Sequence, residues 1–356
     1  MRIESLTVFR FLAALIVVNF HFARKLMDSA DFYTAGPQMV TFFFVLSGFV
    51  MSVAYLGRPA IRPADYWAAR FRRIAPAYYF ALAVSFILLF KSTDFTTFSL
   101  GALFLQSWVS PYALSLNSPG WSLSVEVFLY FTFPFIAYAI RKYRASILWV
   151  CVVAGILWLV TQVVHISLLN SKWYAGYPSL SDDLIYYFPL SHWSSFCLGI
   201  AGGAWFIKYS RRDSFVFTLI ALGLGWLIYY VINHQPQLEQ QFGLLPFKAS
   251  ILAPIFLIFI VSLPQGSRHI NKFLSLYPLK KLGEASYAMY ILQLPLWYIC
   301  HNFYPGFNMD SLSHYYGYLI FLIGFSLVFS VYVEGFFAAR FGFWRPILKS
   351  PTTRIR

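Results

Sequence analysis

Long apolar runs are the feature that most constrains this chain. A helix needs about twenty consecutive apolar residues to cross a bilayer, and windows of that length recur along the whole sequence. Short polar segments separate them. The pattern predicts an all-α, polytopic membrane protein with about ten transmembrane helices, placed near 6–23, 38–56, 75–91, 121–140, 146–167, 187–207, 214–232, 247–264, 285–303 and 315–338.

Composition agrees with this prediction and argues against a nucleic-acid partner. Of the 356 residues, 59% are hydrophobic and only 11% are charged, which is too apolar for an ordinary soluble domain. The net charge of +14 could suggest nucleic-acid binding. However, the basic residues form short clusters between the apolar runs, as orientation signals do. We therefore expect the lipid bilayer, and not nucleic acid, as the partner.

The basic clusters also predict the orientation of the helices. Lysine and arginine concentrate in alternate loops, so the positive-inside rule places both termini in the cytoplasm. The run 98–109 is too short to span and is expected to be interfacial or re-entrant. Without linkers or repeats, the chain is predicted to be one transmembrane domain, 1–345, followed by a short basic cytoplasmic tail, 346–356. The expected location is a plasma membrane.

Two ionisable residues lie inside the first apolar run, "RFLAALIVVNFH". Arg10 and His21 are eleven residues apart, which is about three helical turns, so they share one helix face roughly 16 Å apart. Ionisable groups at membrane depth are costly and usually mark a functional site. We predict that His21 lies toward the outer side of the membrane and Arg10 toward the cytoplasmic side.

Glu126 is predicted to reach a depth similar to that of His21 from the opposite end of its own helix. A carboxylate near a histidine can orient the ring and stabilise its protonated form, so the pair could form a general base. The simpler alternative is that each side chain only bonds a neighbouring helix. The sequence leaves both possibilities open.

Other polar positions carry weaker signals. Ser47 and Gly48 could serve close helix packing alone. An arginine cluster in "RFRRIAP" is either a topology signal or a clamp for phosphates. Interfacial solvation is enough to explain Glu334, and Gln293 is ambiguous. The arginines of the cluster are Arg70, Arg72 and Arg73.

Several motifs together resemble the membrane-bound acyltransferase-3 family, which O-acylates cell-surface glycans. They are the Arg10–His21 spacing, "FFFVLSGF", "RFRRIAP", "GWSLSVEVFLYFTFP", "LGEASYAMYILQLP" and "SVYVEGFFAARF". The resemblance covers essentially the whole chain. It implies that His21 is catalytic and that acyl-coenzyme A contacts Arg10, Arg70 and Arg73; the family's serine-glycine motif corresponds to Ser47 and Gly48, and its glutamate to Glu126.

Two positions depart from the family pattern. A histidine is common where this chain has Gln293, which puts a proton-handling role there in doubt. The late motif often has a proline after its glutamate, but Gly335 and Phe336 follow Glu334. We also expect the fused extracytoplasmic hydrolase-like domain of some relatives to be missing.

The resemblance implies an O-acyltransferase of a bacterial inner membrane. Its co-substrate would be acyl-coenzyme A, most simply acetyl-coenzyme A, with no permanent cofactor and no metal. Its acceptor would be a hydroxyl of an extracytoplasmic glycan or lipid-linked sugar.

Phosphates held by the arginines would let the pantetheine arm run along the first helix to His21. That residue would act as a base or become acylated itself. Trp121, Ser122 or Ser124 could stabilise the oxyanion. The alternative is a transporter or glycolipid flippase that uses the same buried residues as a proton or substrate path. The oligomeric state stays open.

Overall fold

The computed structural model is helical throughout the part of the chain that it describes, residues 3–23, 26, 31–58, 60–211 and 213–336. The α-helices are α1 Ser5–Phe22, α2 Gly36–Tyr55, α3 Pro63–Leu88, α4 Phe95–Ala102, α5 Trp121–Lys142, α6 Ile147–Leu169, α7 Leu180–Tyr186, α8 Pro189–Tyr209, α9 Phe215–Asn233, α10 Gln235–Phe242, α11 Ala253–Ser262, α12 Arg268–Leu274, α13 Tyr277–Phe303 and α14 Leu312–Phe329. Short 3₁₀ turns connect them: η1 Asp31–Thr34, η2 Phe90–Ser92, η3 Gln106–Trp108, η4 Tyr112–Leu114, η5 Ser118–Gly120 and η6 Leu263–Gln265. A π-helical turn, η7 Ser330–Glu334, follows α14.

Seven segments of the described residues are long and apolar enough to cross a membrane. They contain α1, α2, α3, α5, α6, α9 and α14. The three remaining predicted spans correspond to helices α8, α11 and α13. The run 98–109 forms only α4 and the turn η3, so it is not a spanning helix. The predicted tail lies outside the described residues.

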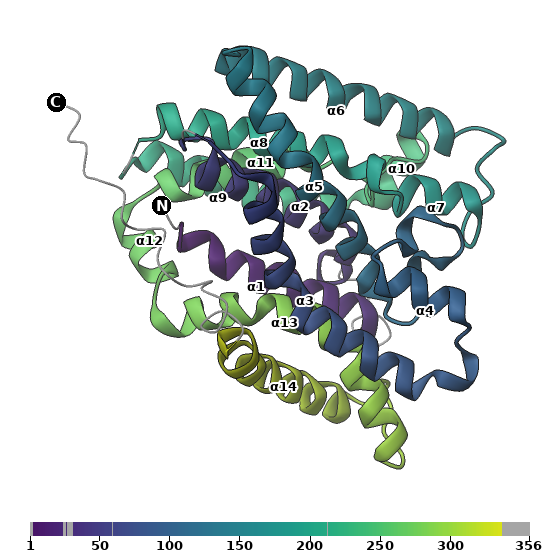
Figure 1. Ribbon diagram of the computed structural model, residues 1–356. Coiled ribbons are helices and arrows are strands. Elements are labelled where there is room, and N and C mark those ends of the chain that lie inside the picture. Colours follow the sequence, from purple (N-terminus) through teal and green to yellow (C-terminus); the bar gives the residue numbers. More distant parts are fainter. Residues whose placement is uncertain (1–2, 24–25, 27–30, 59, 212, 337–356) are drawn as a thin grey trace.

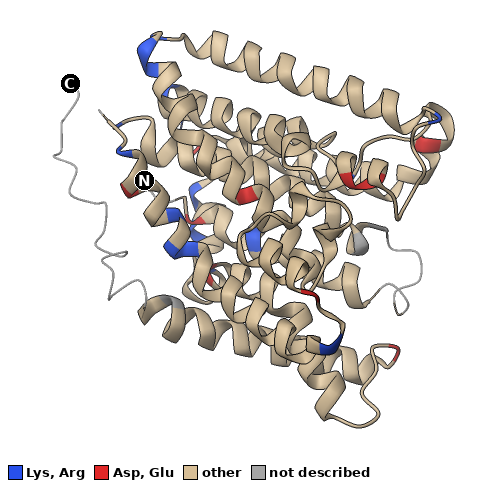
Figure 2. Ribbon diagram, turned by 45° about the vertical axis from the view of Figure 1, so that its right-hand side comes forward, with Lys and Arg blue, Asp and Glu red and all other residues tan. Residues whose placement is uncertain are grey.

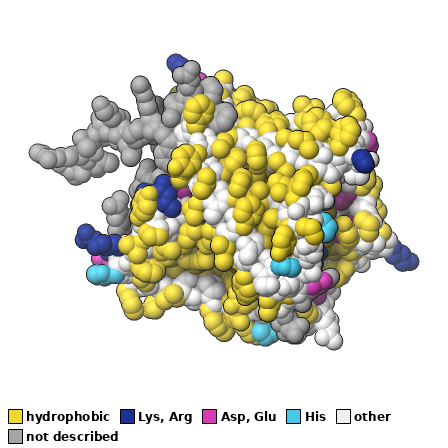
Figure 3. Space-filling model, turned by 90° about the horizontal axis from the view of Figure 1, so that it is seen from below, with side chains coloured by type: hydrophobic (Ala, Val, Ile, Leu, Met, Phe, Trp, Pro, Cys, Tyr) yellow, Lys and Arg dark blue, Asp and Glu magenta, His cyan; other side chains and the backbone are white. Residues whose placement is uncertain are grey.

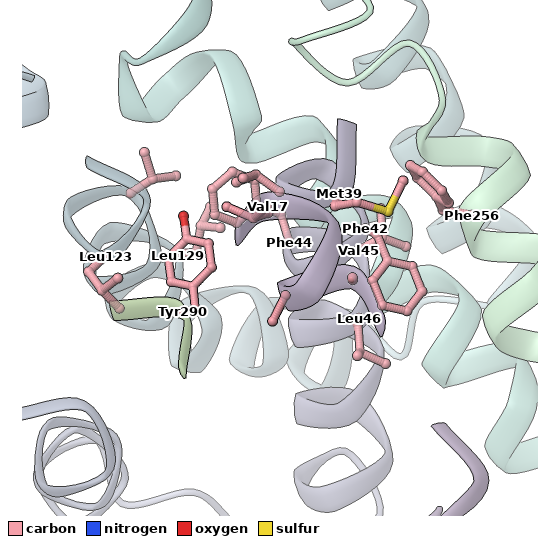
Figure 4. Packing of buried hydrophobic residues seen from close by; sticks show 14 of the residues in the cluster. Val17, Met39, Phe42, Phe44, Val45, Leu46, Leu123, Leu129, Phe256 and Tyr290 are labelled. Carbon is pink, nitrogen blue, oxygen red and sulfur yellow. The ribbon is translucent and has the colours of Figure 1, made fainter. Parts of the chain in front are cut away.

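Helix α2 lies at the centre of the bundle and contacts α1, α5, α8 and α11. Its apolar side chains face both ways: Phe42 meets Phe256 of α11 with ring centroids 5.7 Å apart, while Phe44 points toward the side of Tyr290 (Figure 4). The long helices run side by side, with α13 between α1 and α14 and α6 along one edge (Figure 1). The core is therefore built around α2.

The crossing of α2 and α8 depends on glycine. A Cβ atom added to Gly48 would lie 2.2 Å from the Phe196 carbonyl oxygen, and one added to Gly199 would lie 2.1 Å from the Val45 carbonyl oxygen. Only glycine lets the two backbones approach this closely. Gly48 thus has the role in close helix packing that the sequence analysis considered for it.

Many hydrophobic side chains lie on the outer surface. Seen from the side of α14, they are spread over most of the visible face, with few charged side chains among them (Figure 3). On the opposite edge, α6 exposes Leu148, Trp149, Val153 and Ile156. Soluble proteins rarely expose such a large apolar area, whereas lipid covers it at no cost. The structure is therefore that of a membrane protein.

Candidate functional site

Arg10 and His21 lie on one uninterrupted helix, α1. Their eleven-residue separation corresponds to roughly 16 Å along the axis, as the sequence predicts. Helix α1 packs against α13 and α2. Near its C-terminal end, Asn19 is buried and its Oδ1 accepts a hydrogen bond of 2.6 Å from the Tyr315 hydroxyl on α14. The two predicted residues thus belong to one rigid element.

A cavity of about 150 Å³ opens beside the Arg10 end of α1, between α1, α2, α3, α5 and α13. Its polar lining comes from residues far apart in the sequence: Arg10, Ser47, Arg70, Arg73, Ser122, Glu126, Tyr130, Ser286, Tyr287 and Tyr290. The structure therefore brings together six of the residues singled out from sequence. His21 is not among the residues that line this cavity.

The arginine cluster of α3 divides between two faces of the helix. Arg70 and Arg73 line the cavity, and the Arg73 guanidinium lies 5.5 Å from the centre of the Tyr287 ring. The Arg72 Nε donates to the Ala68 carbonyl oxygen at 3.0 Å, and Arg72 lines a separate apolar groove between α3 and α14. Successive residues differ by about 100° around a helix. Arg72 was predicted to join the other two, and the structure does not place it there.

Glu126 is held by two hydroxyl groups inside the cavity. The Ser47 Oγ donates to its Oε1 at 3.2 Å, and the Tyr130 hydroxyl donates to the same oxygen. The sequence left open whether Glu126 orients His21 or only bonds a neighbouring helix. Among the described residues, Glu126 accepts from Ser47 of α2 and from Tyr130, and it has no hydrogen bond to His21. The geometry therefore favours the second possibility.

The prediction that Glu126 and His21 lie at similar depth assumed that α5 begins at the surface of the protein. The segment before it is folded into the bundle: the Gln106 Nε2 donates to the Gly120 carbonyl at 2.9 Å, and the Ser107 Oγ to the Trp121 carbonyl at 2.9 Å. Gly120 and Trp121 are buried, so α5 starts inside the protein and not at its outer surface. Counting helical rise from the outer surface therefore misjudges the depth of Glu126.

His21 has a different partner, Gln293 of α13. The His21 Nδ1 lies 2.9 Å from the Val17 carbonyl oxygen and 3.0 Å from the Gln293 Oε1. Because the Gln293 Nε2 donates to the Tyr290 carbonyl oxygen at 2.7 Å, the orientation of the amide is fixed with Oε1 toward the histidine. Both neighbours of Nδ1 are acceptors, so Nδ1 carries the proton. In the neutral ring, Nε2 then holds the lone pair.

The polar and aromatic residues of the Trp121–Ser124 motif have different surroundings: one lines the cavity and the others pack inside the protein. The Ser122 Oγ lies 2.7 Å from the Tyr290 hydroxyl at the cavity wall. The Ser124 Oγ donates to the Phe104 carbonyl at 2.5 Å, while the Trp121 ring packs on His192 with centroids 5.3 Å apart. Of Trp121, Ser122 and Ser124, only Ser122 is therefore among the residues that line the cavity. Glu334 ends the turn η7.

Sequence reasoning missed the tyrosines of the site. Tyr130 lies one helical turn after Glu126, a spacing at which side chains meet, so this pair could have been found. Tyr287 lines the cavity and donates to the Ile74 carbonyl at 2.6 Å, and Tyr290 meets Ser122. Both contacts join distant segments and have no local signal in the sequence.

Comparisons with known proteins identify relatives that are acyltransferases. Residues 3–334 match the acyltransferase-3 family, described as an acyltransferase domain. Acyltransferase MdmB of Streptomyces mycarofaciens is 32% identical over 174 residues, which cover 44% of this chain and 44% of that protein. O-acetyltransferase OatA of Staphylococcus aureus is 23% identical over 305 residues, covering 78% of this chain and 48% of OatA.

The alignments thus span less than half the length of each of these relatives. No solved structure matches the chain. The family match covers nearly all of the described residues, including α1, the cavity and Gln293. The chain therefore belongs to the acyltransferase-3 family of membrane acyltransferases.

Proposed function

We propose that this protein transfers an acetyl group from cytoplasmic acetyl-coenzyme A to a hydroxyl of an extracytoplasmic or lipid-linked glycan. The observation that carries the proposal is that α1 has an arginine-lined cavity at one end and a histidine held by Gln293 at the other. The relative OatA is named an O-acetyltransferase, which favours acetyl as the group and oxygen as the acceptor atom.

The cavity suits the anionic part of the donor. Arg10, Arg70 and Arg73 supply guanidinium groups that can bind phosphates with two parallel hydrogen bonds. The Arg70 Nε is buried and has no hydrogen-bond partner among the described residues, which leaves a donor for an incoming oxyanion. The separation of Arg10 and His21 is comparable to the length of an extended pantetheine arm, so the thioester would reach the histidine.

At His21 the reaction needs a proton acceptor. The Nε2 lone pair would take the proton of the acceptor hydroxyl as its oxygen attacks the thioester carbonyl carbon. The carbon–sulfur bond then breaks, the proton passes to the sulfur, and the products are an acetyl ester and free coenzyme A. A covalent acetyl-histidine is the alternative route, with Nε2 as the nucleophile. We favour direct transfer.

The same proposal includes a membrane topology. Ten spans, the seven apolar segments and helices α8, α11 and α13, would place both termini in the cytoplasm of a bacterial inner membrane. Most lysine and arginine residues lie at the end of the bundle that holds the N-terminus, which supports this orientation (Figure 2). Residues 1–345 would form the acyltransferase domain and 346–356 a basic tail.

The decisive experiment uses the purified full chain in detergent with acetyl-coenzyme A labelled in the acetyl group. An acyltransferase should release or transfer the label, whereas a carrier has no reason to break the thioester. Stable, unreacted donor in the presence of the well-folded protein and a set of glycan acceptors would contradict the proposal. Comparing surface-glycan acetylation in a deletion strain and its parent would then identify the acceptor.

A further inference from the structure

Three arginines from different segments meet at Tyr55, the last residue of α2. The Arg58 guanidinium lies 4.4 Å from the centre of the Tyr55 ring, and that of Arg70 lies 6.0 Å from it. Arg141, near the end of α5, donates from its Nη2 to the Tyr55 carbonyl oxygen at 2.7 Å. Arg70 also lines the cavity, so this cluster adjoins the proposed donor site.

Each of these arginines keeps a buried nitrogen without a hydrogen-bond partner. The atoms are the Arg58 Nη2, the Arg70 Nε and the Arg141 Nε. Within the described part of the chain, no carboxylate forms an ion pair with any of the three. A buried donor without an acceptor is costly, and a charged one more so. Three such donors around one residue indicate that an anionic ligand belongs there.

Capping of α2 explains only part of this arrangement. Cations are favoured at a helix C-terminus, and the Arg58 Nε donates to the Ala54 carbonyl oxygen at 3.0 Å while Arg141 bonds that of Tyr55. These bonds account for one nitrogen on each of the two residues. They leave the unpartnered nitrogens of all three arginines unexplained, and Arg70 caps nothing on α2.

We propose that Arg58, Arg70 and Arg141 form a site for a phosphate monoester, the ribose 3′-phosphate of the acyl-coenzyme A donor. This inference rests on the proposed function. The nucleotide would lie beside Tyr55, with Arg70 shared between the 3′-phosphate and the cavity through which the pantetheine arm passes. A doubly charged phosphate offers enough oxygens for the three unpartnered donors. An anionic lipid headgroup has the same chemistry and is the competing source.

The test compares acetyl-coenzyme A with acetyl-dephospho-coenzyme A, which lacks only the 3′-phosphate. The wild-type protein should show a KM roughly tenfold higher for the dephospho donor, as expected for losing charge-assisted hydrogen bonds. Arg58→Gln and Arg141→Gln should raise the KM for acetyl-coenzyme A by a similar factor and leave that for the dephospho donor unchanged. Arg62→Gln, at an exposed position in the same loop, is the matched control and should change neither.

The outcomes separate the two proposals. Transfer from both donors with equal KM in the wild type would overturn the 3′-phosphate site while leaving the acyltransferase intact, and no transfer from either donor would overturn the proposed function. Should the arginine variants not fold, inhibition of the wild type decides: adenosine 3′,5′-bisphosphate should compete roughly tenfold better than ADP, and equal inhibition would overturn the inference.

A lipid source is tested in vesicles of phosphatidylcholine with and without phosphatidylglycerol. If the arginines bind the donor, the KM difference between the two donors should be the same in both vesicles. If phosphatidylglycerol changes activity with both donors equally, and Arg58→Gln and Arg141→Gln abolish that change, the site binds lipid and the proposal is wrong.

Discussion

The two ends of α1 hold polar groups of different kinds. At the Arg10 end, three arginines and Glu126 line one cavity. At the other end, the His21 Nδ1 bonds two neutral acceptors, the Val17 carbonyl and the Gln293 amide. A carboxylate bonded to a histidine favours the charged imidazolium, whereas an amide does not. Under the proposed function, the charged end would bind the anionic donor, and the Gln293 amide would hold the base without stabilising its charged form.

The largest expected effect is that of removing the base. His21→Ala should reduce acetyl transfer by at least about a hundredfold, the usual minimum contribution of a general base. Labelled acetyl-coenzyme A and an accepting glycan provide the assay, and the thermal stability of the variant in detergent is the control. Near-normal transfer by a stable His21→Ala protein would remove the catalytic role from this end of α1.

Changing Gln293 should affect the base through its hydrogen bond. Gln293→Leu should lower kcat by roughly tenfold, because the half-buried His21 ring loses an orienting partner. Gln293→Glu introduces a carboxylate next to Nδ1–H, which stabilises the charged imidazolium over the neutral base. The acidic limb of the pH-rate profile should then move to higher pH.

The control for this pair is Gln162→Glu, which adds the same group at a buried position on α6. It should leave the acidic limb unchanged. If Gln293→Glu also leaves it in place, the hydrogen bond to His21 has no catalytic consequence, and Gln293 serves only the packing of α13.

At the charged end the effect should fall on binding. Arg73→Gln should raise the KM for acetyl-coenzyme A by roughly tenfold with little change in kcat, since phosphate contacts act on the donor whether or not chemistry follows. Arg72→Gln is the matched control: its side chain lies on the other face of α3, and its KM should stay close to the wild-type value. Equal increases in the two variants would show that the effect is only loss of positive charge.

The smallest expected effect concerns Glu126 and pH. Because Glu126 bonds Ser47 and Tyr130 and not His21, Glu126→Gln should leave the acidic limb of the pH-rate profile unchanged. A several-fold change in KM is expected, since the variant removes a negative charge from an arginine-lined cavity. A limb that moves to lower pH would instead mean that the carboxylate stabilises the protonated histidine.

Local periodicity predicted some of these features and missed others. The pairing of Arg10 and His21 on one helix face followed from spacing alone, and the same spacing should have separated Arg72 from Arg70 and Arg73. The contact of His21 with Gln293 joins residues 272 positions apart, so no local signal exists for it.

Depth was harder to predict than helix position. Apolar runs located the long helices because lipid demands about twenty apolar residues from each span. They gave no sign that the segment before Trp121 is buried, since its polar side chains, such as Gln106 and Ser107, are bonded inside the protein. The apolar run 285–303 located only the later part of α13, which begins at Tyr277, because Lys280, Lys281 and Glu284 make its first turns polar.

If one end of α1 binds the donor and the other carries out the chemistry, donor binding to purified variants tests this division most directly. The Kd of acetyl-coenzyme A would be measured by calorimetry for the wild type, His21→Ala and Arg70→Gln in the same detergent. His21→Ala should bind with the wild-type Kd while transferring nothing, and Arg70→Gln should bind at least about tenfold more weakly. The opposite result, weak binding by His21→Ala and normal binding by Arg70→Gln, would contradict the claim.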